Sequence, residues 1–485
     1  MAWPGLVVPW FVATLAAQTE PPPKTEAELD QRVVAALVGF ARSADTWKSP
    51  TRARRAWQQI LDHYDSDNAS ARAGLGQKRV KGEWQVVTPP AELPKDAATP
   101  AQKKQVDDAW RIAAKRVAAL HKGLAQTLDK DGHRAQAIRH FERSLSFQDD
   151  VECHRALGHV AFDGFHGTAE QIAFVQRLRA IFAKARDIAA QPIDVEAVPA
   201  DLLPPELRPM GIEFAGARSK HVTYWVAGSA AAAAKHVAWN ERALLLLEFL
   251  FGDDPEANKY LRKSPRLWVA VLRTKEQRDQ LLVVSPVTRD GEPLDRAKLV
   301  GGTTFPSGSG HAEWVRHRSH DNDHAVGHAT KRGTPWCNSG LSEGLVHVAT
   351  WLLCGTMESS YMQLASTEAG DEEITNEAKL WIDALREEIE LGEDWPLVQV
   401  PRERMSNFRN SVRVKAWSFM TWLLARHPDR WVRLLVELGH EPKLPEEVAA
   451  LFEKVLERPL GEVEAEWREW ARAGSRIGKA SGLPQ

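Results

Sequence analysis

Two histidines in this sequence are spaced so that both could bind one metal ion. They are His324 and His328, in the segment His-Ala-Val-Gly-His. Residues i and i+4 lie on one face of a helix, so both imidazoles can point at a single ion. Glu343 and His347 repeat this spacing, beginning fifteen residues after His328. Two helices that each present such a pair could converge on one ion, and zinc suits imidazole and carboxylate donors.

Histidines are dense around this motif, and the density has a second explanation. Six of the 17 histidines in the chain are His311, His317, His320, His324, His328 and His347. A solvated, histidine-rich surface would produce the same count. If His347 joined His324, His328 and Glu343 as a fourth ligand, the site would be closed and tetrahedral, which is typical of structural rather than catalytic zinc.

The segments around the motif predict a mixed arrangement of strands and helices. Lys220–Val226, Arg266–Leu272 and His311–Val315 have the alternating or continuous apolar pattern of strands, and Ser229–Phe251 and Lys275–Leu282 have the pattern of helices. This order predicts an α+β lobe. From about residue 320 to residue 473 the pattern is almost entirely helical. The glycine-rich segment 301–310 is interpreted as a flexible loop beside the third strand.

From about residue 220 to residue 472 the chain resembles a gluzincin-type metallopeptidase domain, of the kind called peptidase MA-like. Members carry His-Glu-x-x-His on one helix, an edge strand just before it, and a Trp-Leu-x-Glu-Gly-x-Ala segment that supplies the third zinc ligand. The segment 452–467 resembles the end of their helical C-terminal lobe. The resemblance implies a zincin-like fold with a small sheet lobe and a helical lobe. It also implies Zn²⁺ bound by His324, His328 and Glu343, with His347 where a neighbouring residue orients a ligand histidine.

The departures from the family pattern fall on the catalytic groups more than on the metal ligands. The general-base glutamate of the family falls at Ala325, and the tryptophan of the downstream segment falls at Gly340. A tyrosine that begins a later helix in many relatives is replaced near Arg413. Loss of a general base typically lowers the rate on the order of 10²–10⁴-fold. The sequence therefore predicts a zinc-binding, metallopeptidase-like protein that is catalytically impaired.

Asp321 is the best candidate for a substitute base. It lies three residues before His324 and seven before His328, which places it on the same helix face. An aspartate near a helix start is more often a residue that caps the helix or favours its dipole. With Asp321 as the base, the alternative function is an active zinc-dependent hydrolase or peptidase.

The N-terminal half contains two similar stretches, 82 residues apart. Each follows an amphipathic helix and contains Leu-Gly, five residues, a second glycine and then an aromatic residue, at Leu75 to Trp84 and at Leu157 to Phe165. Each is interpreted as a helix pair in the tetratricopeptide (TPR) style, followed by a hairpin that turns at the second glycine. This half supports a third possibility, a non-catalytic helical-repeat scaffold or binding protein.

The N-terminus has the composition of an export signal. Residues 1–17 carry no charge, and the apolar run Leu6–Leu15 ends in Ala16 and Ala17. The usual preceding basic residues are absent and Pro9 interrupts the run, so an apolar helix packed on the domain is the alternative. The sequence predicts a signal peptide at 1–17, a helical repeat-like domain at 18–190, a proline-rich linker at 191–209, a zincin-like domain at 210–475 and a tail at 476–485. Export would make the protein secreted or periplasmic.

Composition excludes two classes of partner. The chain has 63 Lys plus Arg against 65 Asp plus Glu, so the basic surplus typical of nucleic-acid binding is missing. After the N-terminus, the longest apolar stretch is Ala243–Phe251, far short of the about 20 residues that span a bilayer. We therefore expect a peptide or protein ligand and no integral membrane segment. The spacing of the three cysteines leaves open either buried thiols or one bridge, Cys337 with Cys354.

Overall fold

The structure is a computed structural model, and its fold is α+β and mostly helical. It describes residues 21–89, 93–94, 96–263, 267–284, 302–304, 310–314, 321–355, 381–382, 385–386, 388–389, 394–403, 410–441 and 443–481. The expected signal peptide at 1–17 lies outside these residues. The chain divides into two compact units, an N-terminal unit of residues 1–162 with 166–169 and a C-terminal unit of residues 163–165 with 170–485.

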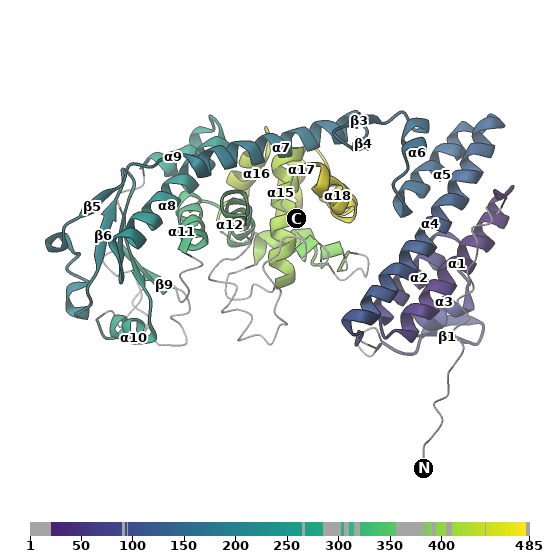
Figure 1. Ribbon diagram of the computed structural model, residues 1–485, viewed down its shortest axis with the longest axis horizontal. Coiled ribbons are helices and arrows are strands. Elements are labelled where there is room, and N and C mark those ends of the chain that lie inside the picture. The colour runs from purple at the N-terminus through teal and green to yellow at the C-terminus, as the bar shows by residue number, and fades with distance from the viewer. Residues whose placement is uncertain are drawn as a thin grey trace, which may run out of the picture. The chain divides into compact units, whose positions relative to one another are not determined.

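The N-terminal unit, completed by residues 163–165 at the second hairpin turn, consists of two copies of one arrangement, a pair of helices, a short helix and a hairpin (Figure 1). The first copy contains α1 (Glu26–Thr46), α2 (Pro50–His63), α3 (Ala69–Gly74), β1 (Gln77–Val80) and β2 (Glu83–Val86). The second contains α4 (Pro100–Lys130), α5 (Arg134–Phe147), α6 (Val151–Ala156), β3 (Val160–Phe162) and β4 (Phe165–Gly167). The expected helix–hairpin units are therefore confirmed, while the likeness to TPR repeats stays a prediction.

Both hairpins turn at the glycine that the sequence singled out. Lys81 and Gly82 have φ angles of 52° and 92°, and Asp163 and Gly164 have φ angles of 46° and 80°. Two consecutive residues with positive φ form the turn that matches the twist of a two-residue hairpin, and glycine adopts it without a Cβ clash. The repeated glycine is thus explained by backbone geometry.

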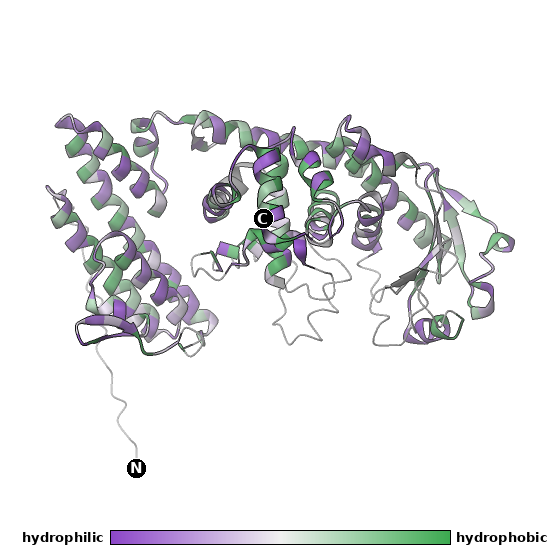
Figure 2. Ribbon diagram, turned by 180° about the vertical axis from the view of Figure 1, so that it is seen from behind, coloured by the Kyte–Doolittle hydropathy of each residue, from purple (hydrophilic) through white to green (hydrophobic). Residues whose placement is uncertain are grey.

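The helices of the N-terminal unit pack through one apolar face each. On α1 the buried residues Leu29, Val33, Leu37 and Phe40 are spaced three and four apart, and they share a core cluster with Trp57 of α2. This spacing places the apolar side chains on a single stripe of the helix. Figure 2 shows hydrophilic and hydrophobic residues mixed along these helices, as amphipathic packing requires.

The C-terminal unit contains a six-stranded sheet in the order β5-β6-β7-β8-β10-β9. Its strands are β5 (Glu196–Val198), β6 (Ala215–Arg218), β7 (Val222–Val226), β8 (Leu267–Leu272), β9 (Gly302–Thr304) and β10 (Gly310–Trp314). Strands β7, β8 and β10 are parallel, and α8 (Ala230–Phe251) connects β7 to β8. Parallel neighbours need such a crossover helix. The three strands and two helices expected between residues 220 and 315 are confirmed, the second helix being α10 (Lys275–Val284).

The strand before the histidine helix is not at the edge of the sheet, contrary to what the resemblance implied. β10 pairs in parallel with β8 and antiparallel with β9, so β9 is the last strand of the described sheet. β9 comes from the segment 301–310 that was interpreted as a loop. Thr303 and Thr304 are β-branched, which favours a strand over the flexibility that the glycines suggest.

Helices fill the rest of the C-terminal unit beside the sheet (Figure 1). They are α7 (Ala169–Ala190), α9 (Pro255–Lys263), α11 (Asp321–Gly333), α12 (Ser339–Cys354), α15 (Asn410–Arg426), α16 (Trp431–Leu438), α17 (Pro445–Leu456) and α18 (Leu460–Ser481). α11 packs between α8 and α12, and α12 packs on α15. The helix layer therefore brings the two segments with i,i+4 pairs, on α11 and α12, next to each other.

The expected proline-rich linker and the expected C-terminal tail both contain regular structure. The proline-rich segment 191–209 contains β5, which pairs antiparallel with β6, and the short 3₁₀ turns Ala200–Leu202 and Arg208–Met210. The division between the compact units falls near residues 162–170, so α7 belongs to the C-terminal unit. α18 extends to Ser481, into the expected tail. Among the described helices, none is both long and apolar enough to cross a membrane.

Candidate metal centre

α11 carries the predicted histidine pair on one buried helix. His324 is 5% exposed, His328 is half-buried, and Ala325 between them is fully buried. A Cβ atom added to Gly327 would lie 3.3 Å from Cγ1 of Val346 on α12. The His-Ala-Val-Gly-His segment therefore lies in the helix layer, where small residues allow α11 and α12 to approach closely.

Burial controls the protonation of this pair. It lowers the pKa of His324, with smaller contributions from the neighbouring His236 and His311. It also lowers the pKa of His328, again with a smaller contribution from His311. Both imidazoles are therefore neutral near pH 7, which is the form that binds a metal ion.

α12 carries the second i,i+4 pair, Glu343 and His347, and both side chains are buried. The helix begins after Asn338, whose side chain accepts a hydrogen bond from the Leu341 amide at 2.9 Å. A Cβ atom on Gly344 would lie 2.6 Å from the Ala416 carbonyl oxygen of α15. The Glu-Gly sequence is therefore required by packing, because only glycine allows α15 to pass this close.

The Glu343 carboxylate is ion-paired with Lys331, which lies on α11. Burial alone would raise the pKa of Glu343, but the interactions with Lys331, His347 and Arg413 outweigh it and lower the pKa below its usual range. The carboxylate is therefore ionised, and an ammonium group already neutralises it. Sequence reasoning missed Lys331, although its position three residues after His328 places it near the same helix face.

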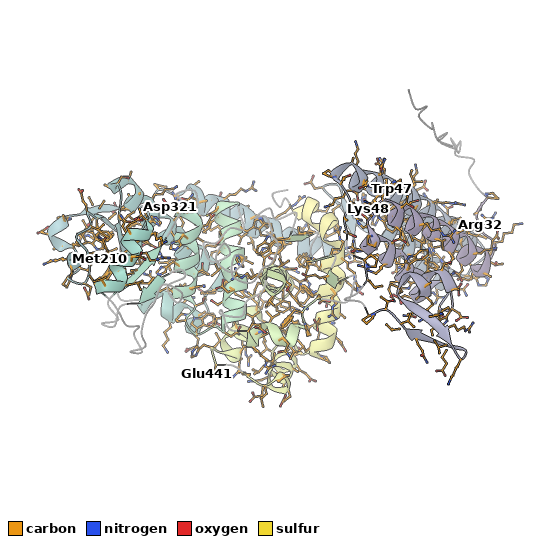
Figure 3. All side chains as sticks on the ribbon, turned by 90° about the horizontal axis from the view of Figure 1, so that it is seen from below. Arg32, Trp47, Lys48, Met210, Asp321 and Glu441 are labelled. Carbon is orange, nitrogen blue, oxygen red and sulfur yellow. The ribbon has the colours of Figure 1, made fainter. Side chains whose placement is uncertain are left out.

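Asp321, labelled in Figure 3, begins α11. Two groups from other elements bind its side chain. Both of its oxygens accept hydrogen bonds from Arg273, at 2.5 Å and 3.0 Å, and His236 Nε2 lies 3.5 Å from Oδ1. Burial would raise the pKa of Asp321, yet His236 and Arg273 together hold it well below its usual range. A carboxylate with so low a pKa is a weak proton acceptor near pH 7.

Two further histidines from outside the helix pair lie close to it. The ring of His311, on β10, is centred 5.3 Å from that of His328, and the ring of His236, on α8, is centred 6.4 Å from that of His324. Sequence reasoning counted His311 only as part of the local density and missed His236. The available signal was the i,i+4 spacing of two polar residues, His236 and Asn240, on a helix rich in apolar residues, and the structure buries both.

The structure brings these groups near one another without closing a metal site. Among the residues that it describes, no three His, Cys, Asp or Glu side chains are arranged to hold an ion. His324 and His328 have the donor chemistry that zinc requires, and Glu343 is ionised. Zinc binding through all three would require Lys331 to release Glu343.

The three cysteines do not contribute to the site. Cys153, Cys337 and Cys354 are free thiols, so the possible bridge between Cys337 and Cys354 is not formed. Burial raises the pKa of the Cys337 thiol, and burial together with Asp323 raises that of Cys354. Both thiols therefore stay protonated, whereas a metal ligand must be a thiolate.

Comparisons of the chain with protein-family models, with curated proteins and with solved structures returned no match. The likeness to a gluzincin-type domain therefore rests on the motifs of this chain and on the order of its elements. The fold class that the structure itself supports is the broader one, α+β with mostly helices.

Proposed function

We propose that the C-terminal unit is a zinc-binding, metallopeptidase-like module whose hydrolytic chemistry is impaired. The observation that carries this proposal is the α11 helix, which presents a buried His324 and a half-buried His328 as neutral imidazoles, with Ala325 at the position of the missing base. Glu343 on the adjacent helix would be the third ligand. His347, one turn further along α12, would orient a ligand or complete the set.

The impairment follows from the groups around the pair. A bound zinc ion would polarise the substrate carbonyl and lower the pKa of a bound water molecule. A peptidase also needs a group that accepts the proton of that water, and Ala325 has none. Asp321 is already bound by Arg273 and lies beside His236, and these contacts argue against its acting as the substitute general base. The alternative of an active hydrolase that uses Asp321 is therefore the weaker one.

Lys331 makes the expected zinc affinity lower than that of an ordinary site with the same ligands. The ammonium and a metal ion compete for one carboxylate, Glu343. Arg413 adds a second positive charge near it. Like charges in a buried site repel strongly because the surroundings screen them poorly.

The sheet suggests how a peptide or protein ligand could be bound beside this centre. β9 is the last strand of the described sheet, and an extended peptide can add to such a strand through main-chain hydrogen bonds.

The scaffold alternative is favoured by the same Lys331–Glu343 pair, because a carboxylate already neutralised needs no metal. The two possibilities differ in the zinc content of the protein.

The deciding experiment is elemental analysis of the full chain, purified without a histidine tag, for wild type, His324→Ala and the exposed-histidine control His133→Ala. We expect His324→Ala to contain one zinc per chain less than the other two proteins. Equal zinc contents in all three, after incubation with excess metal, would overturn the proposal and support the scaffold.

A second experiment tests the impairment. Ala325→Glu restores a carboxylate at the position of the base, and Ala325→Gln adds similar bulk without one. We expect peptidase activity on casein or a fluorogenic peptide library to rise on the order of 10²–10⁴-fold in the glutamate variant alone. Wild-type activity already equal to that of the glutamate variant would contradict the impairment.

A further inference from the structure

The two copies in the N-terminal unit place four equivalent side chains in each hairpin region, offset by 82 positions. In the first copy these are Asp67, Arg72, Gln77 and Trp84, and in the second they are Asp149, His154, His159 and His166. We call these sets the first and the second hairpin cluster. Both surround the short helix and the hairpin that follows it, α3 with β1–β2 and α6 with β3–β4. Three positions that hold a guanidinium, an amide and an indole in one cluster therefore hold imidazoles in the other.

The first hairpin cluster is closed by contacts among its own members. Arg72 Nη1 donates to Gln77 Oε1 at 2.8 Å, and Trp84 Nε1 donates to Asp67 Oδ1 at 2.5 Å. The guanidinium carbon of Arg72 lies 5.9 Å from the centre of the Trp84 ring. These side chains offer donors and a cation, so the cluster serves to hold the hairpin on its helix.

The second hairpin cluster keeps two of these three contacts with different chemistry, while its aspartate contacts His154 in place of the residue that corresponds to Trp84. His154 Nε2 lies 2.6 Å from Asp149 Oδ1, and His154 Nδ1 lies 2.7 Å from His159 Nδ1. The ring of His166 is stacked on that of His154, with centres 5.2 Å apart. His154 is buried, while His159 and His166 are half-buried and within reach of solvent.

The hydrogen bonds orient His154 as a metal ligand is oriented. An ionised carboxylate only accepts hydrogen bonds, so His154 Nε2 carries the proton that Asp149 accepts. A single proton then lies between the two Nδ1 atoms of His154 and His159. A histidine whose far nitrogen donates to a carboxylate is the usual arrangement around a bound metal.

We propose that the second hairpin cluster binds a divalent transition-metal ion of the zinc class through Nδ1 of His154 and Nδ1 of His159, with His166 as a third ligand and Asp149 as the group that orients His154. The ion takes the place of the proton between the two Nδ1 atoms, and that proton moves to Nε2 of His159, so His159 binds as the other neutral tautomer and no net proton is released. With Zn–N bonds of about 2.0–2.1 Å and tetrahedral angles, the two nitrogens would separate to about 3.3 Å.

The required change is small and falls mainly on His159 and His166, which are half-buried. The two Nδ1 atoms move apart from 2.7 Å, and the His166 ring turns off its stack so that a nitrogen faces the ion. Without an ion, no three donors in the described residues converge, and the proton-sharing arrangement is the metal-free form. This site shares no residue with α11 or α12, so it can be tested independently of the proposed function.

The test is calorimetric titration of the chelator-treated full chain with Zn²⁺, with every protein also carrying His324→Ala to remove the α11 site. His159→Gln introduces the residue that the first copy has at this position, Gln77, so the hairpin should accept it. His133→Gln is the matched control, because His133 is exposed on the same unit and its side chain caps no helix. We expect one zinc-binding event that His133→Gln keeps and His159→Gln loses.

A second variant guards against a folding defect. Asp149→Asn keeps a hydrogen-bond acceptor for His154 but removes the charge, and it should weaken zinc binding about 10- to 100-fold. Two results would overturn the proposal: no zinc binding by the His324→Ala protein, or equal binding by His133→Gln, His159→Gln and Asp149→Asn.

Discussion

Two regions of this protein gather histidines, and they differ in the charges around them. On α11, His324 and His328 lie near Arg273 and Lys331, and the nearby carboxylates of Asp321 and Glu343 are already paired with these two cations. In the second hairpin cluster, Asp149 contacts an imidazole directly. The comparison teaches that histidine spacing identifies a candidate ligand set, while the partner of each carboxylate decides how readily the set accepts a cation.

The two regions also differ in how firmly their geometry is held. α11 lies between α8 and α12, and α12 is in close contact with α15 at Gly344. The hairpin histidines extend from a short helix and a two-stranded hairpin, with two of the three rings half-buried. A metal ion would have to displace an ion pair in the first region and only a shared proton in the second.

The largest effect is expected from Lys331→Met. Removal of the ammonium takes the ion-pair partner from the buried carboxylate of Glu343, so the free energy of unfolding in chelator should fall by about 3–5 kcal/mol. Zinc should then restore stability, because it supplies the missing positive charge and binds only the folded protein. Chemical denaturation with and without Zn²⁺ measures both effects.

Lys235→Met is the control for that variant, since Lys235 is an exposed lysine on α8. It should change the free energy of unfolding little. If Lys331→Met matched Lys235→Met, or if zinc failed to stabilise it more than wild type, then Lys331 and a metal would not compete for Glu343. Zinc binding by the second hairpin cluster should be the same in both variants.

A smaller effect is expected from Gly344→Ala. The added Cβ would lie 2.6 Å from the Ala416 carbonyl oxygen, so α12 and α15 must separate, at about 1–3 kcal/mol. Gly39→Ala is the opposite control, because Gly39 lies inside α1 with nothing within 4 Å of its added Cβ. That substitution should stabilise the protein by about 0.5–1 kcal/mol. Thermal unfolding measures both changes in stability. If both substitutions raised or both lowered the unfolding temperature, the packing argument would be contradicted.

A third histidine pair tests what purely structural histidines do. His121 Nε2 is hydrogen-bonded to the Tyr64 hydroxyl at 3.0 Å, and its Nδ1 lies 3.0 Å from Nδ1 of His140. Burial, with the neighbouring His140 and Arg143, lowers the pKa of His121 from 6.5 to about 3. Between these two pH values the unfolded chain therefore takes up a proton that the folded chain does not.

This pair should make the N-terminal unit less stable in mild acid. Above pH 6.5 His121 is neutral in both states and does not change the free energy of unfolding. Below pH 6.5 the free energy of unfolding falls by about 1.4 kcal/mol per pH unit, because the unfolded chain binds the extra proton. Hydrogen exchange of the α4 amides at pH 6 and pH 5, corrected for intrinsic rates, measures the change. His121→Gln, which can still bond to Tyr64, should lose this slope, and an unchanged slope would assign it to other groups.

Much of the fold followed from local sequence patterns. The limits of α8 agree with the expected helix because Ser229 caps its start and Gly252 ends it with a φ of 56°. The hairpin turns followed from glycine at positions with positive φ, and the α11 pair followed from helix periodicity. Each of these depends on residues a few positions apart, which is the range over which propensity and capping act.

Other features depended on contacts between distant segments, and the sequence predicted them incompletely or not at all. β10 lies inside the sheet because β9 pairs beside it, and β9 comes from a segment whose glycines suggested a loop. His236 reaches Asp321 from a helix 85 positions earlier in the chain. Strand order and helix packing decide such neighbours, and no local pattern records them.

By itself, the sequence determined which side chains could act as ligands, and that Ala325, between His324 and His328, cannot accept a proton wherever it lies. Only the tertiary structure decided the charge beside each ligand. Lys331 meets Glu343 and Arg273 meets Asp321 because helix and sheet packing bring together groups that are distant along the chain or on different elements. Electrostatic interactions depend on distance in space and on burial, and both are properties of the folded chain.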